Sequence, residues 1–190
     1  MSFNEELYKK MNDTSYSTSV IDVYYDNNIS KTFIIAGSKG FIQSYDYKNN
    51  QKYHIYKYDD KRYRYNIIIN NNGEMTQLIE TSDFGLIRIW NFHSGQLLTK
   101  IKLYEREEFL SSICLWDNNN LLIGCRNGKI KIININKKKL INEFDACKNI
   151  VINIKKINHS KYGECLISQG ERKEPIKLWG IDNNNDKAKE

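Results

Sequence analysis

The stretch Thr81-Ser82-Asp83-Phe84-Gly85-Leu86-Ile87-Arg88-Ile89-Trp90-Asn91 joins a glycine-containing turn to a short apolar run that ends in tryptophan. Glycine supplies the positive φ that a tight hairpin turn requires, and a β-branched residue would resist that conformation. The run that follows is too short for a helix and carries a charged residue between isoleucines, as a half-buried strand does. The stretch therefore predicts a hairpin turn followed by a β-strand.

The same pattern recurs along the chain at a nearly constant period. Gly40 leads to Tyr45 and Gly128 leads to Ile133 over five residues, and Pro175-Ile176-Lys177-Leu178-Trp179 ends in the same way. We call the last residue of each run the anchor, and the four anchors are Tyr45, Trp90, Ile133 and Trp179. They stand 45, 43 and 46 residues apart. A period of this length indicates a repeated supersecondary unit.

Each period contains short apolar runs separated by turn-forming residues, which predicts four strands per unit. In the first two units we expect strands at 19–25, 32–36, 41–45 and 52–56, then at 66–70, 75–81, 86–90 and 96–103. In the last two we expect strands at 110–116, 120–124, 129–134 and 139–144, then at 151–157, 164–168 and 176–179. The last unit is thus predicted to end without a fourth strand.

Residues 81–91, followed by Ser94-Gly95-Gln96-Leu97, resemble part of a WD repeat, and the resemblance extends over most of the chain. It implies an all-β, WD40-like β-propeller of about four four-stranded antiparallel blades over residues 15–182. The Trp-Asp dipeptide of the family survives only as Tyr45-Asp46, Trp90-Asn91 and Trp179-Gly180, and no Gly-His dipeptide is present. The family often has aspartate six residues before the tryptophan; the corresponding residues here are Lys39, Phe84, Asn127 and Lys173. We therefore expect these blades to depend on apolar packing more than on a buried polar network.

Four blades in an open arc would expose apolar faces on the first and last blades. Three explanations stay open: a fragment of a larger ring, an arc completed by a partner or a second copy, and a small closed ring. Residues 1–14 are expected to supply a fourth strand to a neighbouring or closing blade through Glu6–Met11. Alternatively, Phe3, Leu7 and Met11 fit one face of a short helix. Residues 183–190 are polar and are expected to form a disordered tail.

Composition narrows the class of protein. Of the 190 residues, 40% are hydrophobic and 12% aromatic, which is too apolar for a disordered chain. The net charge is +6, but lysine and arginine occur in every segment, so the charge alone does not indicate a nucleic-acid or membrane partner. The sequence has no run of the ~20 apolar residues that a membrane span needs, and residues 1–14 lack the apolar region of a secretory signal. We expect a cytoplasmic protein, with the nucleus as the alternative.

The sequence offers no recognisable catalytic or metal-binding set. The four cysteines form no CxxC pair and are expected to be reduced thiols. His54, His93 and His159 are isolated and are expected at turns or on the surface. Gly37-Ser38-Lys39-Gly40 lacks the spacing of a phosphate loop and joins two predicted strands, which indicates a hairpin. We expect no enzyme activity, no cofactor and no metal.

The resemblance implies a scaffold that binds partner proteins or peptides on the propeller rim, where the hairpin tips and the links between units gather. The candidate partner-binding residues are Lys39, Asp83, Phe84, Arg126, Arg172 and Lys173. An exposed Phe84 in this basic setting suits an acidic peptide, whereas in a purely structural role it packs within its hairpin. The alternative function is RNA or phosphoinositide binding, through the basic rim and the tyrosine-rich stretches 53–58 and 61–65. In a strand, however, the same alternation places the tyrosines on the packed face.

Overall fold

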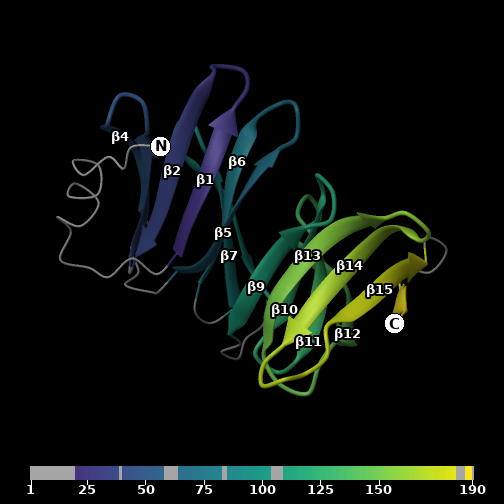
Figure 1. The fold of residues 1–190 in the computed structure, drawn as a ribbon. Coiled ribbons are helices and arrows are strands. Elements are labelled where there is room, and N and C mark those ends of the chain that lie inside the picture. The colour runs from purple at the N-terminus through teal and green to yellow at the C-terminus, as the bar shows by residue number, and fades with distance from the viewer. Residues whose placement is uncertain are drawn as a thin grey trace. The chain divides into compact units, whose positions relative to one another are not determined.

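The computed structural model describes residues 20–38, 40–57, 64–82, 85–103, 109–182 and 187–189. Within these ranges the chain forms four sheets of four strands each (Figure 1). Each sheet is an antiparallel meander in which strands adjacent in sequence pair with one another. The predicted all-β fold with four-stranded units is confirmed.

The strands of the first two sheets are β1 (Val20–Asp26), β2 (Lys31–Ser38), β3 (Phe41–Asp46), β4 (Gln51–Lys57), β5 (Arg64–Asn71), β6 (Thr76–Ser82), β7 (Leu86–Asn91) and β8 (Leu97–Lys102). Those of the last two are β9 (Leu110–Leu115), β10 (Asn120–Cys125), β11 (Lys129–Asn134), β12 (Lys139–Asp145), β13 (Val151–His159), β14 (Gly163–Gly170), β15 (Lys177–Asp182) and β16 (Lys187–Lys189). Each strand predicted from the sequence overlaps an observed strand, and its two ends lie within a few residues of the observed ends.

The end of the chain differs from the prediction. β16 pairs with β15 through Ile181 and Ala188, and it completes the fourth sheet. The prediction that the last unit lacks a fourth strand is therefore wrong, and the expected disordered tail at 183–190 overlaps this strand. The reason is that an edge strand is held by backbone hydrogen bonds, which a polar sequence forms as well as an apolar one. Residues 1–14, with the predicted strand or helix there, lie outside the described residues.

The chain divides into two compact units. The first comprises Met1–Ser82 and Arg88–Lys100 and holds the first sheet with most of the second. The second comprises Asp83–Ile87 and Ile101–Glu190 and holds the third and fourth sheets. Each unit has its own apolar core between two sheets.

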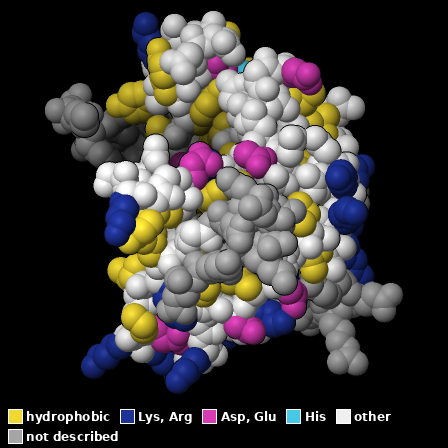
Figure 2. Space-filling view, turned by 90° about the vertical axis from the view of Figure 1, so that its right-hand side faces the viewer, with side chains coloured by type: hydrophobic (Ala, Val, Ile, Leu, Met, Phe, Trp, Pro, Cys, Tyr) yellow, Lys and Arg dark blue, Asp and Glu magenta, His cyan; other side chains and the backbone are white. Residues whose placement is uncertain are grey.

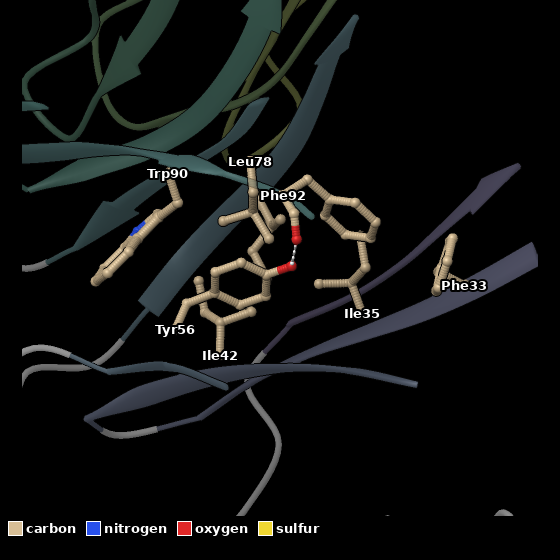
Figure 3. Close-up of a cluster of buried hydrophobic side chains, with 8 residues drawn as sticks. Phe33, Ile35, Ile42, Tyr56, Leu78, Trp90 and Phe92 are labelled. Carbon is tan, nitrogen blue, oxygen red and sulfur yellow. Dashed lines mark hydrogen bonds between the residues drawn. The ribbon is translucent and has the colours of Figure 1, made fainter. Parts of the chain in front are cut away.

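The core of the first unit is aromatic. Its buried members come from both sheets and are Phe33, Ile35, Ile42, Tyr56, Ile67, Leu78, Trp90 and Phe92 (Figure 3). The Tyr56 hydroxyl donates a hydrogen bond of 2.6 Å to the carbonyl of Phe92, so the one polar atom of that ring is satisfied. Burial raises the pKa of Tyr56. This bond joins β4 of the first sheet to the residue that follows β7 of the second.

A polar contact reinforces this pairing at the edge of the core. Nε2 of His93, in the turn after β7, lies 2.9 Å from Oδ2 of the buried Asp26 at the end of β1. Nδ1 of the same ring lies 3.0 Å from the Tyr53 hydroxyl in β4. The predicted turn position of His93 is correct, and the side chain links the two sheets.

The core of the second unit has the same organisation. Its buried members are Cys114, Leu122, Ile130 and Ala146 from the third sheet, and Val151, Ile154, Leu166 and Trp179 from the fourth. The hydroxyls of Ser111 and Ser112 both donate to the Val151 carbonyl, at 2.7 and 3.0 Å. A side chain at Gly124 would collide with Ser112 and Val151, so glycine there lets the fourth sheet approach the third.

A buried ion pair lies within the second sheet. Arg88 is fully buried and Glu80 is 1% exposed, and Nη1 of Arg88 lies 3.0 Å from Oε1 of Glu80. The same nitrogen donates to the Ser82 hydroxyl at 3.3 Å. Removing two charges from water is costly, so each of them depends on the other remaining ionised.

We expect Glu80→Gln to destabilise the protein by about 3 to 5 kcal/mol, because it removes the charge of the carboxylate 3.0 Å from a fully buried guanidinium. The double variant Glu80→Leu/Arg88→Met should recover most of this loss, because it removes both charges and keeps the volume. Urea unfolding of the three proteins measures the difference. A double variant as unstable as Glu80→Gln would contradict the explanation.

Candidate partner-binding rim

Three links meet at one end of the second unit, and we call this end the rim. They are the β10–β11 turn at 126–128, the β12–β13 link at 146–150 and the β14–β15 link at 171–176. The amides of Ala146 and Cys147 both donate to the Gly128 carbonyl, at 2.9 and 3.0 Å. The amide of Glu171 donates to the Ile150 carbonyl at 3.0 Å. Backbone bonds thus hold the three links together, as expected for hairpin tips and inter-unit links that share one rim.

Glu174 ties two of these links through its carboxylate. Its Oε2 accepts a 3.0 Å bond from the Lys148 amide, and its Oε1 accepts a 3.3 Å bond from the Asn149 side chain. A carboxylate that accepts hydrogen bonds from both partners fixes the position of the link that carries it. The Lys148 side chain itself is exposed.

Three of the predicted partner-binding residues lie on this rim. Arg126 is exposed, and its guanidinium carbon lies 5.2 Å from the centre of the partly buried Phe109 ring. Arg172 and Lys173 form the tip of the β14–β15 link, where both have positive φ (57° and 64°) and both are exposed. The Arg172 side chain is 80% exposed, and its Nε lies 3.7 Å from Glu171.

The other three predicted residues, Lys39, Asp83 and Phe84, lie outside the described residues. Sequence reasoning missed Phe109, Lys148 and Glu174, which the structure also places at the rim. The links between units follow no repeated pattern, so no sequence signal identified them. Position alone was available: Phe109 and Lys148 lie between the last strand of one sheet and the first strand of the next, and Glu174 lies in the β14–β15 link.

The charge at the rim is basic but not uniformly so. Arg126, Lys148, Arg172 and Lys173 are exposed, while Glu171 and Glu174 take part in the contacts described above. On the face drawn in Figure 2, acidic and basic side chains both occur.

The cysteines and histidines form no chemical centre within the described ranges. All four cysteines are free thiols, and burial raises the pKa of Cys114 and of Cys147. Nδ1 of His159 accepts hydrogen bonds from the amides of Lys161 and Tyr162, which closes the turn after β13. In the part of the chain that the structure describes, no group of three His, Cys, Asp or Glu side chains is arranged to hold a metal ion. The same part contains no helix long and apolar enough to cross a membrane.

The anchors occupy equivalent places in the four sheets. Each lies in the third strand, and none is more than 5% exposed; they are Tyr45, Trp90, Ile133 and Trp179. The residue after the anchor closes the next turn in three sheets, because the side chains of Asp46, Asn91 and Asn134 each accept a bond from the amide three residues later. In the fourth sheet this residue is Gly180, but Nε1 of the Trp179 anchor donates to the Ser168 hydroxyl at 2.8 Å.

Solved structures share this arrangement. The WD40 repeats of RRP9 match with a TM-score of 0.68 at 15% identity, over 92% of this chain and 50% of that one. U3-55K matches equally well, at 15% identity over 92% of this chain and 51% of that one. The four sheets are WD40-type propeller blades. The computationally designed protein Ika4 matches with a TM-score of 0.62 at 16% identity, over 87% of this chain and 94% of that one.

We number the blades 1 to 4 in chain order, from β1–β4 to β13–β16. The chain spans about half the length of the RRP9 and U3-55K structures. No model of a protein family matches the sequence, and no curated protein sequence matches it. The chain therefore has this fold with anchors and turns that differ from the usual WD signature. Asn127, which takes the place of the family's aspartate, accepts a 3.2 Å bond from the Lys129 amide within its own hairpin.

We expect Gly128→Ala to destabilise the second unit by about 2 to 4 kcal/mol, from strain at positive φ together with overpacking. Gly128 has φ of 84°, and a side chain there would collide with the carbonyl oxygens of Cys147 and Asn149. Gly163→Ala is the matched control, because Gly163 has φ of 72° but open space around it, and should cost about 1 kcal/mol. Denaturant unfolding followed by tryptophan fluorescence measures both. Equal losses would show that the rim links do not constrain this glycine.

Proposed function

We propose that the protein is a non-catalytic scaffold that binds an acidic segment of a partner protein at the rim of blades 3 and 4. The observation that supports this most is the set of exposed basic side chains on the rim, one of which, Arg126, lies 5.2 Å from the centre of the partly buried Phe109 ring. Three backbone links held to one another present these side chains, so little conformational entropy is lost when a ligand binds. Basic side chains around an aromatic ring favour a peptide with acidic residues and one apolar side chain.

The residues that hold the rim links in place differ from the residues that give the rim its positive charge. The Glu174 carboxylate and the backbone bonds at Gly128 join the links to one another. The contacts described for the Arg126 and Arg172 side chains, to Phe109 and Glu171, do not join one of these links to another. Substitution of the arginines should therefore change binding and leave folding intact. This separation makes the proposal testable by charge reversal.

We expect Arg126→Glu/Arg172→Glu to weaken partner binding by more than tenfold, because two attractive charges become repulsive. The matched control is Lys137→Glu/Lys161→Glu, which reverses two exposed lysines at the opposite ends of the strands in the same two blades. Affinity capture from native lysate, quantified by mass spectrometry, compares both variants with the natural chain. Thermal unfolding confirms that the variants fold. Capture that falls equally with both variants, or with neither, would contradict the rim as the binding site.

The same experiment distinguishes RNA or phosphoinositide binding. Nuclease treatment before capture, and vesicles with and without phosphoinositide, separate these ligands from protein. A polyanion would dissociate steeply as salt rises, because its binding depends on counterion release. Tyr56 is buried in the core of blades 1 and 2 and Tyr53 is partly buried against it, so we expect these two rings to be poor surfaces for stacking on bases.

A further inference from the structure

An isoleucine stands three residues before every anchor, and its exposure differs in one blade. The four residues are Ile42, Ile87, Ile130 and Ile176. Ile42 lies in the core of blades 1 and 2, Ile130 lies in the core of blades 3 and 4, and both are fully buried. Ile87 is also fully buried, but Ile176 is 66% exposed. The last blade thus exposes an apolar side chain at a position that the repeat otherwise buries.

Ile176 directly precedes β15, and strand alternation continued from Leu178, two residues later, assigns it to the same face as Leu178. We call the side of a blade that carries this isoleucine its leading face, and the opposite side, which carries the anchor, its trailing face. In blade 4, Ile157 pairs with Cys165 and Ile167 pairs with Leu178, on the opposite side from Leu166 and Trp179. Ile157, Ile167 and Leu178 are only partly buried. Ile167 corresponds to Ile35 of blade 1 and Leu122 of blade 3, which are 0% and 1% exposed.

In both cores the leading face of one blade packs on the trailing face of the next. Ile42 of blade 1 belongs to the same core as Leu78 and Trp90 of blade 2. Ile130 of blade 3 likewise belongs to the same core as Leu166 and Trp179 of blade 4. The contact therefore has a fixed chemistry, in which isoleucine on one side faces a leucine and an aromatic anchor on the other.

Blade 1 carries the trailing-face set as well. Val23 pairs with Ile34, and Ile34 pairs with Tyr45, so the three share one face. Ile34 and Tyr45 hold the places of Leu78 and Trp90 in blade 2. Tyr45 is already buried, but Val23 is 63% exposed, and Ile55 on the same face is 54% exposed.

We propose that the leading face of blade 4 docks on the trailing face of blade 1 in a second copy of this chain. The two faces repeat the contact that each unit already makes internally, which argues for another copy rather than an unrelated partner. Such a contact is heterologous, because two different surfaces meet, and it forms a ring when the rotation closes and a chain of copies when it does not. Ile176 also ends the β14–β15 link of the rim, so the experiment below measures the mass of the assembly and not ligand binding.

Charge placed at an exposed position of either face should separate the copies without affecting the fold. We expect the natural chain to sediment as two copies or more, with masses in multiples of 22.5 kDa. Val23→Glu and Ile176→Glu should each sediment as a single chain at the same concentration. The control Ile141→Glu, at an isoleucine of β12 that is 39% exposed, should behave as the natural chain.

A mixture of the two variants tests whether the molecule that binds the exposed face is a second copy of this chain. Each variant keeps one natural face, so an equimolar mixture of Val23→Glu and Ile176→Glu should form a two-chain species through one intact contact. Analytical ultracentrifugation of a mixture with one labelled variant detects this species. A natural chain that sediments singly would overturn the proposal. So would variants that remain assembled, or a mixture that stays single, because a heterologous contact must be restored by complementation.

Discussion

In each of the two compact units, the first sheet is apolar on a face that it cannot cover alone, and the anchor side chain of the second sheet helps to cover it. Trp90 packs near Tyr56, with ring centres 6.0 Å apart, and Trp179 packs near Phe144, with ring centres 4.8 Å apart. A single small sheet would be only marginally stable in water, so these contacts between sheets supply the stability that hydrogen bonding within a sheet does not. This requirement explains why the anchors are almost evenly spaced in the sequence: each sheet has to place its large side chain at the equivalent position of its third strand.

Polar groups have been retained where they support this packing. The expectation that the blades depend on apolar packing agrees with the two cores, yet Arg88 with Glu80 and Trp179 with Ser168 are buried polar pairs. His93 joins Asp26 and Tyr53 at the edge of the first core. These contacts differ from blade to blade, so the repeat specifies apolar positions more strictly than polar ones. A WD40-type fold can therefore persist when most of its signature residues have been replaced.

The sequence was sufficient to predict the strands and the repeat, because glycine before the third strand and a large residue at its end are local signals. Part of the candidate site was predictable for the same reason: Arg126, Arg172 and Lys173 occupy hairpin tips. Lys148, Phe109 and Glu174 were not predicted, since the links that carry them gain their positions from tertiary contacts. β16 was missed because its polar residues give no periodicity, and the Arg88–Glu80 pair was missed because its residues come from two strands whose register the sequence does not specify.

The packing of anchors between sheets is tested most directly by nuclear Overhauser effects between aromatic rings. The account predicts cross-peaks from the Trp90 indole to the Tyr56 ring and from the Trp179 indole to the Phe144 ring, because each pair joins two different sheets in direct contact. A well-dispersed spectrum that lacks both sets of cross-peaks would contradict it.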